Sequence, residues 1–217
     1  MKKVIYNKFP KPEIASLPLV EFDGRTFVMV SEMEAEKAVE YLLAQPRLGI
    51  DTETRPSFRR GRLNLVALLQ VATDDACFLF RLNRTGLTPS IIRLLENTEV
   101  PMIGLSLHDD ILSLKRRGNF TPGRFIDLQS MVGRLGIEDM SLQKLYANLF
   151  GQKINKKQQL TNWEADVLTD KQIRYAATDA WACIRLYDEI NRLLETGDFS
   201  LETVPEEVEN DENFDSK

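Results

Sequence analysis

The chain has 217 residues, which is enough for one domain of ordinary size with short terminal segments. Its hydrophobic content of 43% supports a buried core, and no stretch approaches the ~18 apolar residues of a membrane span. We therefore expect no membrane segment and a cytoplasmic location. The formal net charge is −5, but seven acids and one lysine lie from Leu201 onward, which leaves a nearly neutral body. A neutral body argues against a long, tightly held polyanion, and two cysteines without CxxC spacing argue against structural zinc.

The N-terminal part predicts an arm, a hairpin and a helix. Residues 1–18 contain three prolines, and we expect them to form a loosely packed arm. Residues 19–30 alternate apolar and polar side chains around a central Asp-Gly pair, a pattern typical of a β-hairpin. A helix is then expected to begin at Ser31, where Glu34 completes a capping box.

The rest of the chain alternates strand and helix patterns. Strands are expected at 47–53, 63–72, 76–82, 102–107 and 124–128, and helices at 88–95, 108–117, 128–135 and 142–149. Strands first, then strands alternating with helices, predict an α/β domain with a mixed β-sheet flanked by helices, over residues 19–200. Residues 201–217 are acidic with few large apolar groups and are expected to form a disordered tail.

The longest predicted helix spans residues 169–194 and carries the first chemical signal. Thr169 and Gln172 form a capping box at its start, and apolar residues repeat at three and four positions along it. Tyr175 and Asp179 lie four residues apart on a second face, which becomes apolar further along the helix. A carboxylate there needs a compensating cation, although a surface hydrogen bond between the two residues is the commoner explanation for such a pair alone.

Two further places put acids at the end of a strand or the start of a helix. Asp51 and Glu53 point to the same side of a predicted strand, where two carboxylates repel unless a cation lies between them. A solvated strand end is the alternative. Asp109 and Asp110 open a predicted helix, and Ser106 with Asp109 fits a capping pattern. That pattern leaves Asp110 without a structural role.

The candidate ligands Asp51, Glu53, Asp110 and Asp179 offer only carboxylate oxygens. Such a set selects a hard cation, Mg²⁺ or Mn²⁺, over zinc. Several carboxylates without histidine are what a site with two divalent cations needs for phosphoryl chemistry. Tyr175 has an ordinary pKa near 10, too high for an efficient base at neutral pH, so orienting a water suits it better.

These residues resemble a known set of motifs. DTE at 51–53, Asp110 after IGLSLHD, and YAATD at 175–179 are similar to the three motifs of the DEDD superfamily of 3′–5′ exonucleases, which have a ribonuclease H-like fold. The tyrosine four residues before Asp179 indicates the Tyr subclass. The resemblance covers about residues 20–195, and residues 151–182 are similar to Werner-type exonuclease domains and to ribonuclease D.

The resemblance implies how the catalytic residues share the metals. Asp51 would contact both ions, Glu53 and Asp179 would complete the first site, and Asp110 would hold the second ion through water. The resemblance also implies cleavage from nucleic-acid 3′ ends with release of nucleoside 5′-monophosphates. A Werner-type domain without a following helical domain favours DNA over RNA.

Substrate contacts are predicted beside the first acid pair and before the long helix. Arginines bind phosphates and aromatic rings stack on bases. The candidates are Thr52, Arg55, Phe58, Arg59 and Trp163, and the alternative for these loops is simple solvation or packing.

Two alternatives to the enzyme stay open. The first is a catalytically weak nucleic-acid-binding module with the same fold, and the second is an α/β domain whose acids are incidental. The presence of all four acids and the tyrosine favours the enzyme. The sequence indicates no protein partner.

Overall fold

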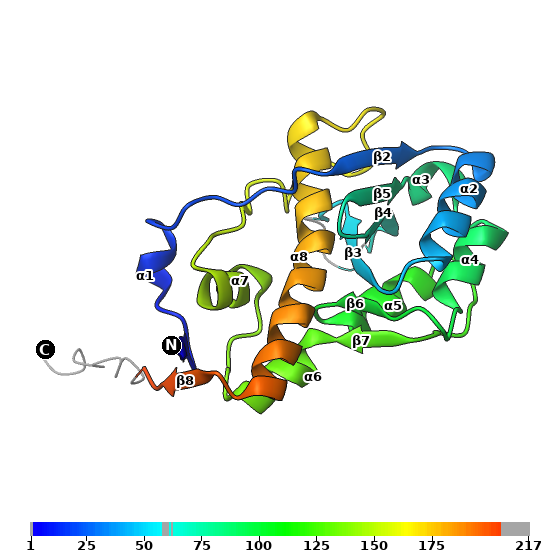
Figure 1. The fold of residues 1–217 in the computed structure, drawn as a ribbon. Coiled ribbons are helices and arrows are strands. Elements are labelled where there is room, and N and C mark those ends of the chain that lie inside the picture. The colour runs from blue at the N-terminus through cyan, green and yellow to red at the C-terminus, as the bar shows by residue number, and fades with distance from the viewer. Residues whose placement is uncertain (1, 58–60, 62, 205–217) are drawn as a thin grey trace, which may run out of the picture.

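The computed structural model describes residues 2–57, 61 and 63–204. At its centre is a six-stranded sheet with the strand order β2-β5-β4-β3-β6-β7 (Figure 1). The strands are β2 (Arg25–Met29), β3 (Leu48–Thr54), β4 (Val66–Ala72), β5 (Ala76–Phe80), β6 (Met102–Gly104) and β7 (Phe125–Asp127). β4 runs antiparallel to β3 and to β5, and the remaining neighbours are parallel. The predicted mixed sheet is therefore confirmed.

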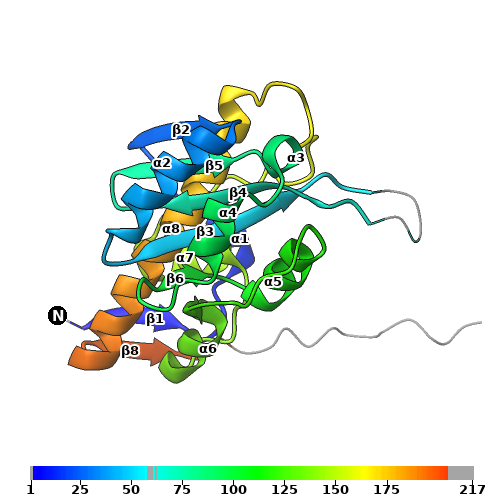
Figure 2. The same cartoon turned by 90° about the vertical axis from the view of Figure 1, so that its right-hand side faces the viewer.

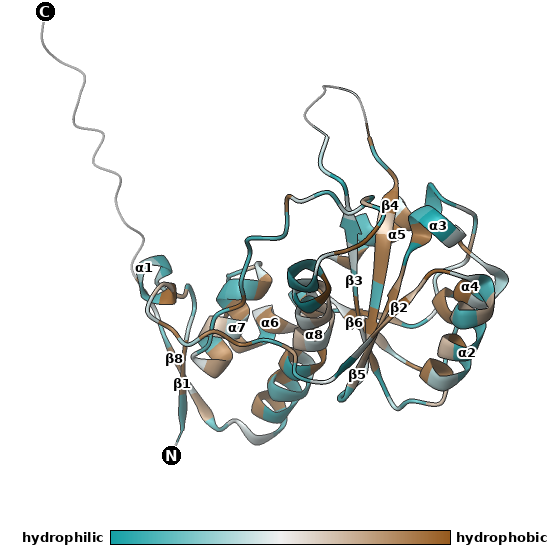
Figure 3. Cartoon of the chain, turned by 90° about the horizontal axis from the view of Figure 1, so that it is seen from above, coloured by the Kyte–Doolittle hydropathy of each residue, from teal (hydrophilic) through white to brown (hydrophobic). Residues whose placement is uncertain are grey.

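Helices cover both faces of this sheet. α2 (Glu32–Leu43) and α4 (Pro89–Leu95) pack on one face, and the long helix α8 (Asp170–Thr196) crosses the other (Figure 3). β4 is buried along its whole length because it lies between these two layers. The other helices are α1 (Lys11–Ile14), α3 (Leu82–Thr85), α5 (Leu107–Lys115), α6 (Leu128–Val132), the 3-10 helix Gly133–Leu135 and α7 (Leu142–Phe150).

The sequence signals at the starts of α2 and α8 and at the end of α7 are confirmed. Complete capping boxes are present at Ser31 for α2 and at Thr169 for α8. Each satisfies backbone N–H groups that the first helical turn leaves without partners. α7 ends at Gly151, which has φ of 63°, in the left-handed region where glycine carries no steric cost.

A glycine sets how closely α8 approaches β3. A Cβ added to Gly49 would overlap the backbone carbonyl oxygen of Ala180 on α8. Any larger residue would push the helix away from the strand. The next residue on the same side of β3 is Asp51, and Asp179 precedes Ala180 on the helix, so this close contact brings their two elements together.

The predicted hairpin at residues 19–30 is wrong. Only Arg25–Met29 forms a strand there, and it pairs in parallel with β5, which comes later in the chain. The preceding residues are held elsewhere: Leu19 bridges to Lys153, and the backbone N–H of Phe22 donates to the Thr178 hydroxyl at 3.0 Å. Alternation did not indicate the partner, because the backbone at Lys153 and the side chain of Thr178 bind the first half of the segment.

The N-terminal residues are not a loose arm. β1 (Lys3–Tyr6) pairs in parallel with β8 (Phe199–Glu202), and Ile5 is fully buried (Figure 2). The Asn148 amide accepts from the Tyr6 N–H at 2.9 Å and donates to its carbonyl at 2.7 Å, as a neighbouring strand would. The start of the predicted tail thus lies in a strand, and residues 205–217 lie outside the described residues.

Cys77 and Cys183 are buried free thiols. Among the described helices, none combines the length and the apolar character that a membrane span requires.

Candidate active site

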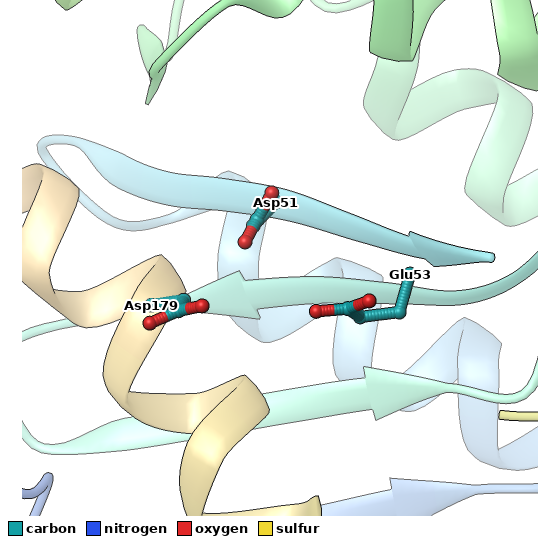
Figure 4. Close-up of side chains that lie close together, drawn as sticks. All are labelled: Asp51, Glu53 and Asp179. Carbon is teal, nitrogen blue, oxygen red and sulfur yellow. The ribbon is translucent and has the colours of Figure 1, made fainter. Parts of the chain in front are cut away.

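Three carboxylates converge where α8 crosses β3 (Figure 4). Asp51 and Glu53 lie two residues apart on β3, on the side that faces α8, and Asp179 reaches them from the helix. One oxygen from each residue can be chosen so that all three lie within 4.8 Å of one another. The three side chains form the only such group of potential metal ligands within the described parts of the chain.

This convergence is electrostatically costly without a cation. Glu53 and Asp179 are 7% and 6% exposed. Burial, followed by the charge of Asp51, raises the pKa of Glu53 to about 10. Burial, followed by the charges of Asp179 and Asp110, also raises the pKa of Asp51 well above its ordinary value. The carboxylates can therefore be ionised together at neutral pH only if positive charge joins them.

Asp110 approaches the cluster from α5 and is joined to it by Thr52. The Thr52 hydroxyl, between the two acids of β3, donates a hydrogen bond to Asp110. Burial raises the pKa of Asp110 to about 6, although this hydrogen bond lowers it. Asp109 is exposed. Of the two neighbouring acids, Asp110 is the one joined to the site, although it belongs neither to the group of three carboxylates nor to the lining of their cavity.

The predicted cap at the start of α5 is wrong. Ser106 has φ of 61° and makes no side-chain capping bond. The carboxylate of Asp127, at the end of β7, instead accepts from the N–H groups of Ser106 at 3.1 Å and Leu107 at 2.8 Å. A distant strand end supplies this cap, so no local pattern could have indicated it.

Tyr175 lies one turn before Asp179 on α8 and acts on it directly. A hydrogen bond from Tyr175 lowers the pKa of Asp179, as does the charge of Lys156, but burial is the largest effect and raises it to about 7. Burial and nearby acids raise the pKa of Tyr175 itself above its usual range. In the metal-free protein Tyr175 therefore keeps its proton and can act as a hydrogen-bond donor.

The predicted stacking role of Trp163 is wrong. Trp163 is fully buried, so neither face of its ring is open to a base. Its ring centroid lies 6.0 Å from that of Tyr175, and its indole N–H donates to the Gln159 carbonyl at 3.4 Å. The tryptophan therefore supports the tyrosine from inside the fold. Its position before α8 indicated proximity to the site but not the direction of the side chain.

The other predicted substrate contacts have different outcomes. Arg55 is exposed beside the site and pairs with Glu164 at 3.3 Å. Thr52 lines the same cavity as the acids. Phe58 and Arg59 lie outside the described residues.

The acids open into a cavity of about 260 Å³ whose far wall the sequence patterns did not indicate. Leu105 follows β6, and Leu142 and Gln143 begin α7, so tertiary packing alone brings them to the acids. Lys156, from the basic link before α8, also lines this cavity. The site thus combines carboxylates with the apolar side chains of Leu105, Leu142 and Ile154 and one exposed cation, Lys156.

The donor set fits a divalent metal ion. All candidate ligands are carboxylate oxygens, which hard cations prefer. The Oδ1 atom of Asp179 is buried and has no hydrogen-bond partner in the described part of the chain. A buried carboxylate oxygen without a partner is costly, and a cation is the simplest partner for it.

Comparisons with known proteins identify the family of this chain. A family model described as 3′-5′ exonuclease matches residues 27–195. A 3′-5′ exonuclease of Arabidopsis thaliana is 27% identical over 206 residues, which cover 87% of this chain and 72% of that protein. The bifunctional 3′-5′ exonuclease/ATP-dependent helicase WRN of Mus musculus is 28% identical over 191 residues, which cover 83% of this chain but 14% of that protein.

A solved structure shares the fold. The EXO domain of Aedes aegypti Nibbler superimposes with a TM-score of 0.72 at 22% identity, covering 81% of this chain and 91% of that one. The mixed sheet flanked by helices is therefore the ribonuclease H-like architecture of exonucleases, as the motif resemblance implied.

Proposed function

The chain belongs to the 3′–5′ exonuclease family, and we propose that it removes nucleotides from nucleic-acid 3′ ends by a mechanism that uses two divalent cations, Mg²⁺ or Mn²⁺. The observation that carries this proposal is the convergence of three carboxylates within 4.8 Å, with raised pKa values for each. We assign the catalytic domain to residues 19–200 and the chain to the Tyr subclass of the DEDD exonucleases.

Asp51, Glu53 and Asp179 would hold the first cation, and Asp51 with Asp110 the second. When bound, such cations activate a water and neutralise charge on the leaving oxygen. The Tyr175 hydroxyl, protonated and facing Asp179, would orient the attacking water. The products of this reaction are nucleoside 5′-monophosphates.

The cavity walls suggest how the 3′ end is held. Lys156 lines the cavity beside Asp179 and carries the positive charge that a substrate phosphate requires. Leu105 and Leu142 offer apolar surface against which the terminal sugar and base can pack. A small number of such contacts is consistent with the nearly neutral charge of residues 1–200, because only the last nucleotides would be held.

We propose DNA in preference to RNA as the substrate. The support is the similarity to the DNA polymerase I of Aquifex aeolicus, which is 28% identical over 166 residues. Because this chain covers only 27% of that protein, the preference must be measured on this chain itself.

The test compares 5′-labelled DNA with a recessed 3′ end and 5′-labelled single-stranded RNA, each with Mg²⁺ or Mn²⁺. We expect a ladder that shortens from the 3′ end, faster on DNA, and lost in EDTA or in Asp51→Asn. Asp110→Asn should also abolish the ladder, whereas its exposed neighbour Asp109→Asn should retain it. No shortening by the folded wild type with metal would refute the proposal, and binding without shortening would indicate a non-catalytic module.

A further inference from the structure

Gln70 is a polar side chain in an otherwise apolar strand. It lies in the middle of β4 and is fully buried. Neither its Nε2 nor its Oε1 atom has a hydrogen-bond partner within the described residues. A buried amide without partners is unfavourable, and methionine would fill similar space without this cost. The position therefore calls for an explanation beyond packing.

The register of the sheet places Gln70 beside the acids. In the antiparallel β3–β4 pair, Gln70 lies directly opposite Asp51. Side chains in such a pair point to the same face, with Cβ atoms roughly 4.5–5.5 Å apart. This face carries α8, because Leu68 and Ala72, two residues to either side of Gln70, pack in the same cluster as Ala180.

The missing partners occur together. Across the described residues, the buried side-chain atoms without a hydrogen bond belong only to Gln70 and Asp179. Asp179 comes from α8 and meets Asp51 in the acid cluster (Figure 4). Both unsatisfied groups thus border Asp51, one from the neighbouring strand and one from the helix above it.

We propose that Gln70 is a positioning residue of the metal site, whose amide N–H donates through one ordered water to the Asp51 carboxylate once that carboxylate is ionised. This inference rests on the proposed function, since the carboxylate has to be held in its ionised form to bind a metal. The Asp51 Oδ1 atom already accepts from the backbone N–H of Thr52 at 2.8 Å. Gln70 adds a second, uncharged donor from the neighbouring strand, and such outer contacts fix the orientation of metal ligands.

The test uses Gln70→Met, which keeps the size of the side chain and removes the donor. We expect the affinity for Mn²⁺, measured by calorimetry without nucleic acid, to fall about tenfold or more. The turnover number should fall by a similar factor while the KM for an oligonucleotide stays unchanged. The metal-free variant should melt at a higher temperature than the wild type, because an unsatisfied amide is removed.

Leu79→Met is the matched control. Leu79 is buried on β5 and lies directly opposite Gln70 in the β4–β5 pair, so it faces the same helix, α8. The substitution changes packing in this layer but removes no hydrogen-bond donor, so Mn²⁺ affinity should remain near that of the wild type.

Gln70→Leu supplies a second variant if Gln70→Met does not fold. It also removes the donor and adds no charge, so Mn²⁺ affinity should also fall. Mn²⁺ affinity equal to that of the wild type, in whichever variant folds, would overturn the inference. Because metal binding is measured apart from cleavage, a wild type that binds Mn²⁺ but does not cut would refute the proposed function and still leave this comparison decisive.

Discussion

Replacing Glu53 with glutamine should stabilise the metal-free protein at neutral pH. Glu53 has an ordinary pKa of 4.5 but a pKa of about 10 in the folded chain, with burial as the main cause. At pH 7 the unfolded chain carries the ionised carboxylate, whereas the folded chain carries the protonated one. Folding must therefore take up a proton, and this opposes folding more strongly as the pH rises.

The size of this change in the free energy of unfolding follows from the difference between the pH and the ordinary pKa of Glu53. Because each pH unit above 4.5 costs about 1.4 kcal/mol, the free energy of unfolding at pH 7 is lowered by about 3 kcal/mol. Glutamine has a similar shape and takes up no proton, so Glu53→Gln should recover this amount. For a domain of this size, that corresponds to a rise of about 6–12 °C in melting temperature.

The assay is thermal unfolding in EDTA from pH 5 to pH 8, with Glu40→Gln, an exposed glutamate on α2, as the control. The difference between Glu53→Gln and wild type should be small at pH 5 and should grow as the pH rises towards 8. Mn²⁺ should reverse the order, because a cation stabilises the ionised carboxylate of the wild type. If Glu53→Gln melts at or below the wild-type temperature in EDTA at pH 8, the electrostatic reasoning is refuted.

Three further predictions concern the neighbours of the acid cluster. Tyr175→Phe should lower the turnover number about a hundredfold with little change in KM, since it removes one oriented donor. Steady-state kinetics measures this, and a turnover number for the variant equal to that of the wild type would contradict it. Gly49→Ala should lower the free energy of unfolding by about 1–3 kcal/mol, because the new Cβ meets the Ala180 carbonyl. Urea titration measures this loss, and an unchanged midpoint would show that α8 can move away freely. Trp163→Ala should lose about 3–5 kcal/mol of stability, and a loss of oligonucleotide affinity alone would restore the discarded stacking role.

Most of the fold follows from local patterns because its elements carry local signals. The capping boxes at Ser31 and Thr169 mark the starts of α2 and α8, and Gly151 marks the end of α7. These signals act within one helical turn, so the sequence alone reveals them. The failures occurred where a distant segment supplies the partner. β2 pairs with β5 and not with the residues just before it, and β1 pairs with β8 at the other end of the chain.

The acid site shows the same division. Spacing indicated that Asp51 and Glu53 share one side of a strand, and both lie in the acid cluster. The Thr52 hydroxyl bond to Asp110 and the burial of Trp163 depend on how α5 and the loop before α8 pack, which spacing does not encode. Side-chain identity thus predicted the ligands better than it predicted their surroundings.

A close helix–sheet contact is what brings three ordinary acids into one cluster. Asp179 can reach Asp51 only because Gly49 lets the backbone of α8 approach β3, with Ala180 at the point of contact. The same approach excludes water, which raises the pKa of each carboxylate and makes a cation the favourable partner. Residues without any chemistry of their own therefore determine how closely these carboxylates approach one another.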